Sequence, residues 1–316
     1  MTPATEHVLL SIPAIAIHGG AGAFERVRSS QDELELEEVL VRAVHAGWAV
    51  LASGGPALES VVEAVASMEE SGRFNAGVGG TPTSDGTLEL DAAVMDGRTG
   101  IAGAVCATTW PRNPVRAALA VAELRGSTVD LRGPVLLAGI GADQFAREEG
   151  LARMVRPTEE VDGVVQEPAS PVGTVGAVAV DATGHLAAAT STGGRAGQHR
   201  GRVGDSPIPG AGTWADDATA AVSATGEGEA FVVAGFAHLV DWGLREGSGL
   251  IDAVGRAMSE VKSRGGEGGA IVITATGELL CTFDTRAMAR GWKSSTQTRI
   301  AVLQGVSRDP PETTNG

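Results

Sequence analysis

The stretch Gly173-Thr174-Val175-Gly176-Ala177-Val178-Ala179-Val180-Asp181 decides the fold, because an apolar strand begins directly after a Gly-Thr bond. A short apolar run bounded by turn residues is typical of a buried strand. Cleavage of the Gly173–Thr174 bond would give Thr174 a free α-amine beside its own hydroxyl, and such an amine can serve as the general base for a weak hydroxyl nucleophile. We therefore take this bond as a candidate self-cleavage site and Thr174 as the candidate nucleophile.

The composition around this strand is that of a globular protein with an acidic surface. The chain has 316 residues, 43% of them hydrophobic, a net charge of −15 and two cysteines. The negative charge argues against a nucleic-acid partner, since phosphate binding depends on Lys and Arg. No run approaches the ~20 apolar residues of a membrane span. The apolar run from Val8 to Ile17 is interpreted as a buried strand rather than a signal peptide, and few cysteines fit a reducing cytoplasm.

Strand signals gather at both ends of the chain, with helical patterns grouped between them. This order favours an α+β fold in a single domain, with layers around stacked sheets, rather than strict βαβ alternation. A linker without periodicity is expected over about 155–173. The expected strands are 12–18, 88–95, 102–108, 135–138, 174–181, 186–190, 220–223, 270–274 and 279–283, the last two closing the fold. The expected helices are 31–53, 56–68, 114–124, 143–149, 229–242 and 250–261.

Three hydroxyls stand at the end of the strand that follows, in Thr190-Ser191-Thr192-Gly193-Gly194. One interpretation is a polar strand end that turns at the glycines. The alternative is that Thr192 lies beside Thr174 on the neighbouring strand and hydrogen-bonds to its hydroxyl or amine.

A cation and an anion stand three residues apart in Gly201-Arg202-Val203-Gly204-Asp205. They could form a salt bridge in a surface turn. Alternatively, Arg202 would bind the carboxylate and Asp205 the ammonium of an α-amino acid, since a guanidinium suits bidentate carboxylate binding.

The segment Thr225-Gly226-Glu227-Gly228-Glu229 joins a strand to a helix. Thr225 could simply cap that helix. Backbone N–H groups at such a junction also make a natural oxyanion site, and both glutamates suit the first helical turn. The upstream His18 is interpreted as a hydrogen-bonded histidine at a strand end rather than as a ligand.

Together these segments resemble the plant-type L-asparaginases, or isoaspartyl aminopeptidases, of the N-terminal nucleophile hydrolases. The resemblance runs from about Ile12 to Trp292. It rests on HGGAG (18–22), FNAGVGG (74–80), LDAAVMDG (90–97), GTVGAVAVD (173–181), TSTGG (190–194), GRVGDSPIPGAG (201–212) and TGEGE (225–229).

The resemblance implies a four-layer αββα sandwich, made as a precursor that cuts itself into 1–173 and 174–316. It implies hydrolysis of L-asparagine and β-aspartyl dipeptides in the cytoplasm, without a cofactor, by a homodimer of αβ units. By matching motifs, the resemblance makes Thr174 the nucleophile, Gly173–Thr174 the cleavage site and Thr192 the threonine that orients the nucleophile. Thr225 and Gly226 would form the oxyanion hole, Arg202 and Asp205 would bind the substrate's α-carboxylate and α-amine, and Gly228 would line the amine pocket. Asn75 would support the nucleophile region, and the HGGAG loop would help precursor cleavage.

Relatives hold a sodium ion in the loop that here includes Met68, Glu69 and Phe74, so a structural Na⁺ is an expectation. The sequence departs from the family pattern at Gly72, where proline is frequent, at Asp284, where Asn is usual, and in a shorter linker. Two alternatives stay open. One is a glycosylasparaginase-like hydrolase, which turnover of glycosylated asparagine would reveal. The other is an uncleaved, non-catalytic scaffold, which would remain a single chain.

Overall fold

A computed structural model describes residues 3–22, 24, 27, 29–124, 133–155, 159–161, 164–166 and 173–303. Within these ranges helices and strands alternate irregularly, as the α+β prediction requires. The strands are β1 (Ala4–Leu9), β2 (Ala14–Gly22), β3 (Leu90–Asp96), β4 (Ala102–Thr108), β5 (Leu136–Ala138), β6 (Glu159–Val161), β7 (Val164–Gln166), β8 (Val175–Val180), β9 (Leu186–Thr192), β10 (Thr213–Ala215), β11 (Ala220–Gly226), β12 (Gly268–Thr274), β13 (Glu278–Phe283), β14 (Ala287–Ser294) and β15 (Thr298–Ala301). The α-helices are α1 (Ser30–Ala52), α2 (Ala57–Glu70), α3 (Pro114–Glu123), α4 (Gly139–Glu148), α5 (Gly228–Ala234), α6 (Phe236–Arg245) and α7 (Leu250–Ser263), and a 3₁₀ turn spans Gly77–Gly79.

The larger sheet has the strand order β15-β14-β2-β8-β9-β3-β4-β5. The candidate nucleophile therefore stands at the entrance to a central strand, β8. Strand β8 pairs antiparallel with β2 on one side and with β9 on the other. Strand β2 also pairs antiparallel with β14, so strands from both sides of the Gly173–Thr174 bond interleave in one sheet.

The smaller sheet has the order β1-β13-β12-β11-β10 and packs face to face with the larger one. Alternate residues of β8 serve different cores, as strand geometry requires. Val178 and Val180 join Ile271 and Ile273 in the core between the sheets. Ala177 and Ala179 face the opposite side, where they pack with α1, α2 and α3.

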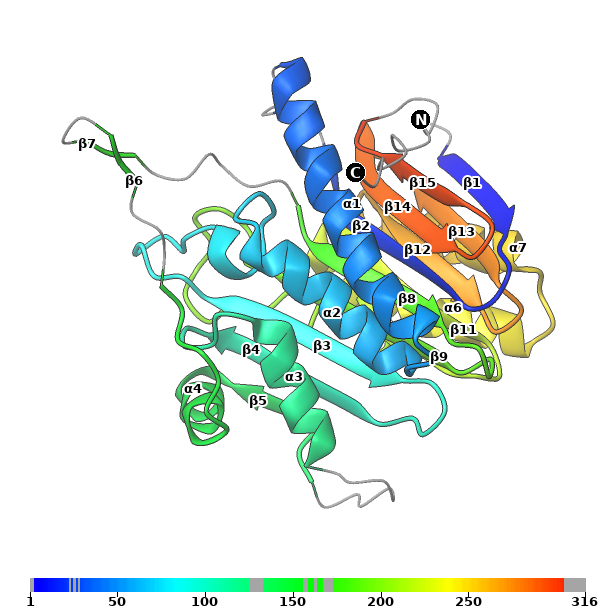
Figure 1. Ribbon diagram of the computed structural model, residues 1–316, viewed down its shortest axis with the longest axis horizontal. Coiled ribbons are helices and arrows are strands. Elements are labelled where there is room, and N and C mark those ends of the chain that lie inside the picture. Colours follow the sequence, from blue (N-terminus) through cyan, green and yellow to red (C-terminus); the bar gives the residue numbers. More distant parts are fainter. Residues whose placement is uncertain are drawn as a thin grey trace.

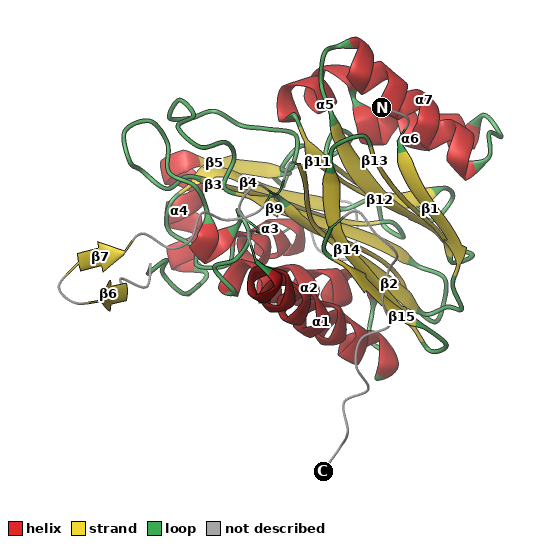
Figure 2. Cartoon of the chain, turned by 90° about the horizontal axis from the view of Figure 1, so that it is seen from above, coloured by secondary structure: helices red, strands yellow, loops and turns green. Residues whose placement is uncertain are grey.

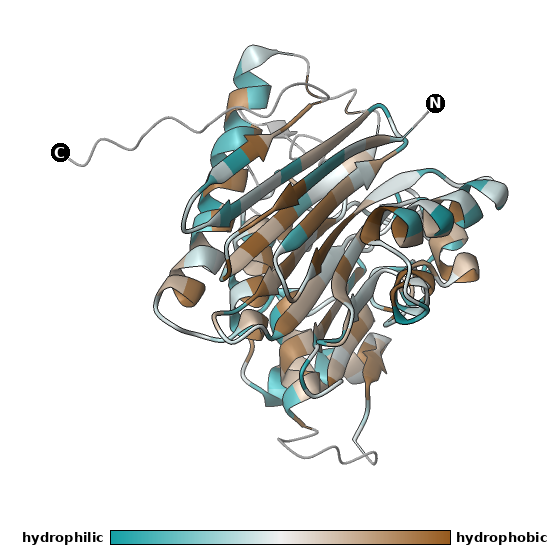
Figure 3. Ribbon diagram, turned by 90° about the vertical axis from the view of Figure 1, so that its right-hand side faces the viewer, coloured by the Kyte–Doolittle hydropathy of each residue, from teal (hydrophilic) through white to brown (hydrophobic). Residues whose placement is uncertain are grey.

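Helices cover the outer face of each sheet (Figures 1 and 2). Helices α1, α2 and α3 bury their apolar faces against the larger sheet, and α5, α6 and α7 do the same against the smaller one. Figure 3 shows brown, hydrophobic residues concentrated along the strands, while the helices carry both colours. The longest helix, α1, begins with a capping box in which the Ser29 hydroxyl accepts from Asp32 N–H and the Asp32 carboxylate accepts from Ser29 N–H.

Several expected boundaries are wrong. Strand β2 does not stop at His18 but continues through the glycines to Gly22, because β14 pairs with it as far as that residue. The helix expected over 229–242 is two helices, since Gly235 adopts a left-handed conformation (φ +63°) that ends α5. The fold does not close at Phe283, because β14 and β15 follow.

The N-terminal apolar run also divides into two strands. Strand β1 pairs with β13 in the smaller sheet, and β2 begins after Pro13 in the larger one. Most of the linker expected over 155–173 lies outside the described residues, except for the short β6–β7 pair and two ends: Val155, and Gly173, where the description resumes. Among the described residues, no helix has the length and apolar character needed to cross a membrane.

Candidate active site

The two candidate threonines meet as strand pairing predicts. Val175 of β8 faces Ser191 of β9 in the antiparallel register, which places Thr174 opposite Thr192 at the same edge of the sheet. Their Oγ1 atoms are 3.0 Å apart, a hydrogen-bonding distance. Thr192 is 3% exposed, and its Oγ1 also accepts from Gly194 N–H at 3.1 Å. The expected contact between these hydroxyls is confirmed, and the strand also ends at Thr192 before the glycines, so both interpretations of this segment hold.

The Gly173 carbonyl, one bond before Thr174, is held by backbone contacts. Asn75 N–H donates to the Gly173 oxygen at 3.0 Å. Gly173 has φ +32°, and a Cβ at this position would lie 2.6 Å from the Cα of Gly20. Gly20 has φ +101°, and a Cβ there would lie 2.5 Å from the Cα of Gly173. The HGGAG segment and the candidate cleavage site therefore touch through two glycines, and neither position has room for a side chain.

The side chain of Asn75 braces the turn after Thr192. Its Nδ2 donates to the Gly194 oxygen at 2.6 Å, and its Oδ1 accepts from Thr81 N–H at 2.9 Å. Its backbone oxygen accepts from Gly193 N–H at 2.8 Å. Asn75 thus links the carbonyl before the nucleophile to the glycines after the orienting threonine, which agrees with a supporting role.

Thr225 and Gly226 end strand β11, close to the HGGAG segment. The Thr225 Oγ1 accepts from Ala21 N–H at 3.3 Å, and Ala21 follows the glycine that packs on Gly173. Thr225 does not cap a helix: α5 begins at Gly228 after Glu227, whose side chain makes no capping bond. The helix-cap alternative is therefore wrong, because the strand continues to Gly226.

Gly226 is fixed by the neighbouring strand. It pairs with Gly268 of β12, and a Cβ on Gly226 would lie 2.5 Å from the Gly268 Cα. The Asp284 carboxylate accepts from Gly268 N–H at 2.8 Å. The unusual Asp284 thus anchors the strand beside the candidate oxyanion donors.

Arg202, Asp205 and Gly228 come together as predicted. A Cβ on Gly228 would lie 2.9 Å from Asp205 Oδ1 and 3.0 Å from Arg202 Nη2, so only glycine leaves space beside both charged groups. Arg202 also makes a contact that the sequence analysis missed. Its Nε and Nη2 donate to the two oxygens of Glu229 at 3.0 and 2.8 Å. These hydrogen bonds lower the pKa of Glu229 to about 2.

Two carboxyl groups are buried beneath Arg202. Asp205 is 5% exposed and its Oδ2 has no hydrogen-bond partner. Burial raises the pKa of Asp205 to about 7, with Arg202 opposing the rise and Asp91 adding to it. Asp91 faces Thr192 in the β3–β9 register, and burial raises its pKa to about 6. Asp91 was not singled out from the sequence, although it stands in the quoted LDAAVMDG motif.

A buried polar chain joins the two sheets below the threonine pair. His18 Nε2 lies 2.9 Å from Ser223 Oγ, which lies 2.7 Å from Thr190 Oγ1. The Cα of Gly176 packs against this chain, since a Cβ there would meet Ser223 Oγ at 2.0 Å and His18 Nε2 at 2.4 Å. Burial lowers the pKa of His18 to about 3, and the backbone of Thr174 opposes this only partly. His18 is therefore a neutral, fully buried group within β2, not at a strand end.

The expected sodium loop follows α2 and turns at two glycines. A Cβ on Gly77 would lie 2.7 Å from the Glu69 oxygen, and a Cβ on Gly79 would lie 2.2 Å from the Phe74 oxygen. The Met68 oxygen accepts from both the N–H and the hydroxyl of Ser71. The Phe74 oxygen accepts from Ala76 N–H at 2.8 Å, and a sodium ion in this loop stays a prediction. In the described part of the chain, no group of three or more His, Cys, Asp or Glu side chains could hold a metal.

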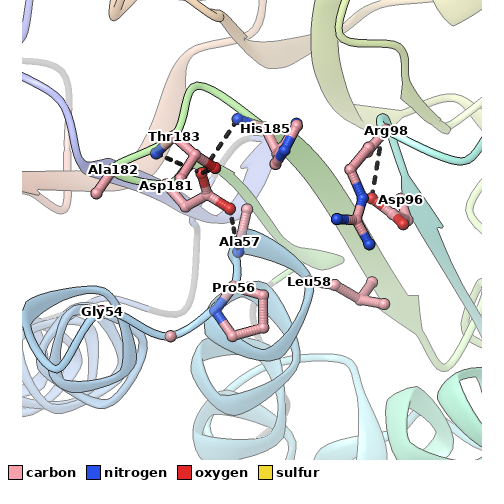
Figure 4. A pocket seen from close by; sticks show the side chains of 11 residues that line it. Gly54, Pro56, Ala57, Leu58, Asp96, Arg98, Asp181, Ala182, Thr183 and His185 are labelled. Carbon is pink, nitrogen blue, oxygen red and sulfur yellow. Dashed lines mark hydrogen bonds between the residues drawn. The ribbon is translucent and has the colours of Figure 1, made fainter.

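A cavity of about 480 Å³ lies at the other end of β8, where Asp181 follows the strand (Figure 4). The loop before α2 and the β3–β4 and β8–β9 turns line it. Its buried carboxylate is already satisfied, since Asp181 Oδ1 accepts from Thr183 N–H, the Thr183 hydroxyl and His185 N–H. Thr174 stands at the opposite end of the strand, so this cavity is separate from the threonine site.

The fold and the site define an α+β protein whose candidate nucleophile is a threonine paired with a second threonine. A family model described as asparaginase matches residues 11–167 and 153–302, and the chain belongs to this family. The isoaspartyl peptidase of Escherichia coli (strain K12) is 42% identical over 305 residues, which cover 88% of this chain and 92% of that protein.

Two further relatives extend this similarity beyond the bacteria. The plant-type L-asparaginase of Pyrobaculum calidifontis is 38% identical, covering 91% of this chain and 99% of that protein. The human isoaspartyl peptidase/L-asparaginase is 33% identical, covering 96% of this chain and 98% of that protein.

Proposed function

We propose that the protein is a hydrolase that cleaves L-asparagine and β-aspartyl dipeptides and releases L-aspartate. Membership of the asparaginase family and relatives named isoaspartyl peptidase and L-asparaginase support this activity. The observation that carries the proposal is the Thr174–Thr192 hydroxyl pair beside the constrained Gly173 carbonyl. The candidate amino-acid binding pair lies close by, since Asp91 faces Thr192 in the β3–β9 register and interacts electrostatically with Arg202.

The chain would first activate itself at this carbonyl. Thr174 Oγ1 attacks the carbon of the Gly173 carbonyl, the peptide C–N bond breaks, and the acyl group moves from nitrogen to oxygen as an ester. The hydroxyl proton passes to the Thr174 nitrogen, which leaves as an amine. Water then hydrolyses the ester to the Gly173 carboxylate and a free Thr174 α-amine. Asn75 N–H already donates to the Gly173 oxygen and would stabilise the negative charge that develops on it. The left-handed Gly173, packed on Gly20, would hold the carbonyl in position for attack.

The freed α-amine would then serve as the base for the substrate. Its reference pKa is about 7.7–8.0, so a large share is unprotonated at neutral pH. It would take the proton of the Thr174 hydroxyl as Oγ1 attacks the side-chain carbonyl of asparagine or the β-aspartyl bond. Thr225 and Gly226 would stabilise the oxyanion, and Thr192 would orient Oγ1. Ammonia or the leaving amino acid departs with that proton, and water releases aspartate from the acyl-enzyme.

The substrate's amino-acid head would bind between Arg202 and Asp205. Glu229 holds Nε and Nη2 of Arg202 and thereby fixes the plane of the guanidinium. Nη1 makes only a long hydrogen bond to Gln198 Oε1, at 3.5 Å, and would turn to the substrate carboxylate. The buried Asp205 would bind the ammonium group in its ionised form. Gly228 would leave room for that group.

The finer architecture and assembly are part of the same proposal. Helices on the outer faces of two packed sheets support a four-layer αββα sandwich of the N-terminal nucleophile type. The mature form would consist of 1–173 and 174–316, assembled as a dimer of such units. A sodium ion in the loop of Met68, Glu69 and Phe74 would be structural, and its ligands would be backbone oxygens.

Intact-mass measurement under denaturing conditions tests this function together with an amidase assay. After incubation at neutral pH, the 31.9 kDa chain should give two fragments that meet between Gly173 and Thr174. Thr174→Ala should remain one chain and release no ammonia from L-asparagine. Normal turnover by this variant would overturn the assignment, and a stable, inactive wild-type chain would support the scaffold alternative.

A further inference from the structure

Arg195 stands at the rim of the candidate site, three residues after Thr192. Two side chains hold its backbone in place. Asn75 Nδ2 donates to the oxygen of the preceding Gly194, and Arg195 N–H donates to Gln198 Oε1 at 2.9 Å. Its guanidinium extends to the segment that flanks Gly228, where its Nη1 lies 3.6 Å from Glu227 Oε2 and 3.5 Å from Glu229 Oε2. Arg195 therefore belongs to the wall that encloses the amino-acid head.

The two arginines on this wall differ in how much binding capacity remains. Arg202 is 16% exposed and makes two short hydrogen bonds to Glu229. The Arg195 side chain is 56% exposed, and its two carboxylate contacts are beyond ordinary hydrogen-bond length. A guanidinium has five N–H donors. The N–H groups of the Arg195 guanidinium can therefore bind a ligand at the rim, because only its long contacts to Glu227 and Glu229 would be lost.

The two proposed substrates differ in charge at this rim. L-asparagine brings one ammonium and one carboxylate, which Asp205 and Arg202 match. A β-aspartyl dipeptide adds a second carboxylate on its leaving amino acid. The surroundings are acidic, since Glu227, Glu229 and Asp205 lie near and the whole chain has a charge of −15. A second carboxylate would be repelled here unless a cation received it.

We propose that Arg195 binds the free carboxylate of the leaving amino acid and so favours β-aspartyl dipeptides over L-asparagine. This inference rests on the proposed hydrolase function and adds a residue that determines specificity. Arg195 reaches from Glu229, which also holds Arg202, so the two guanidiniums are close enough to receive the two carboxylates of one dipeptide. The dipeptide carboxylate would displace the long contact to Glu227 and leave the Arg202–Glu229 pair intact.

Steady-state kinetics of Arg195→Gln on three substrates test this inference. The substrates are β-aspartyl-alanine, its C-terminal amide, and L-asparagine. We expect KM for β-aspartyl-alanine to rise about threefold to fivefold, the upper part of the range for an exposed charge pair. The amide and L-asparagine lack the second carboxylate, so their KM should change less than twofold. Arg195→Lys, which retains the charge, should recover part of the loss.

Arg98→Gln is the matched control, because it removes the same charge from an exposed arginine at the far end of β8. It should leave all three substrates unchanged. An equal loss on all three substrates in Arg195→Gln would mean that Arg195 serves the shared amino-acid head, and no loss on any of them would mean that it binds nothing. Either result overturns the inference while the hydrolase function stands. Wild-type protein that hydrolyses none of the three overturns both.

Discussion

Glycine at two contacting positions gives this site its geometry. Gly20 and Gly173 both have positive φ angles, and each occupies the space into which a side chain of the other would project. L-residues other than glycine pay about 1 kcal/mol or more for such a conformation, before any clash is counted. The carbonyl that Thr174 would attack is therefore held by the absence of side chains as much as by hydrogen bonds.

Gly20→Ala should slow self-cleavage by tenfold or more, because its Cβ would press on the Cα of Gly173 and move the carbonyl away from Asn75 N–H. Cleavage is followed by intact mass over several days. Gly22→Ala is the control, since Gly22 lies in the same strand and its Cβ would meet nothing within 4 Å. Equal cleavage rates in the two variants would separate the HGGAG segment from the reaction.

The buried carboxyl of Asp205 should make substrate binding depend on pH. Its pKa is raised to about 7, so protonation as the pH falls through 7 removes the negative charge that binds the substrate ammonium. KM for L-asparagine should rise as the pH falls from 8 to 6, by up to about tenfold per pH unit below the pKa. The Thr174 amine titrates in the same pH range and acts on kcat, because it serves as the base. KM is therefore the value that reports on Asp205. In Asp205→Asn, KM should be high and nearly constant over this range, and an unchanged KM profile would remove Asp205 from amine binding.

At the scale of strands and helices, the sequence pattern predicts those elements whose contacts are made by residues close together in the chain. The strand pairing that joins Thr174 to Thr192 follows from two neighbouring runs with a tight turn at Ala182-Thr183-Gly184. Strand β14 does not follow from the sequence, because the charged Arg290 interrupts its apolar pattern. Arg290 is nevertheless 3% exposed, since it pairs with Glu6 from the distant strand β1.

The same limit explains the site residues that the sequence did not reveal. His18 meets Ser223 across two sheets, 205 positions apart, and Glu229 in the first turn of α5 meets Arg202 in the loop before β10. Neither pair follows a periodicity that a single sequence displays. Both motifs were recognised, but their mutual contacts depend on how the sheets stack.

The contact between β2 and β11 through His18 should weaken in acid. The pKa of His18 falls from 6.5 to about 3 on burial, so the unfolded chain binds a proton that the folded chain excludes. Stability is therefore lost as the pH falls from 6.5 towards 3, by up to about 1.4 kcal/mol per pH unit. His18→Gln lacks this titration, so its deficit in unfolding free energy relative to His18 should shrink between pH 7.5 and 5. Urea unfolding in the uncut Thr174→Ala background measures this, and a constant deficit would contradict it.

For the whole molecule, cleavage should not separate the two parts. Strand β2 comes from the first part and lies between β8 and β14 of the second, while β9 pairs with β3. The strand pairs and cores that join them do not depend on the Gly173–Thr174 bond. Size-exclusion chromatography should therefore give the same elution volume for wild type and Thr174→Ala, while denaturing electrophoresis separates only the wild type. Release of a free fragment under native conditions would contradict the interleaved sheet.

Because the strands of the two parts interleave, the uncut and the cut protein should differ in how they refold although their folded structures are the same. The uncut chain folds in a first-order process, whereas two cut chains must find each other by diffusion, and each alone lacks half of the central sheet. Once cleaved, the molecule has lost the covalent connection that assembled it. Heated wild type should recover less completely as it is diluted, while uncut Thr174→Ala should refold to the same extent at every concentration. A mature molecule that unfolds would therefore rarely regain its native structure, so its working life would end at its first unfolding.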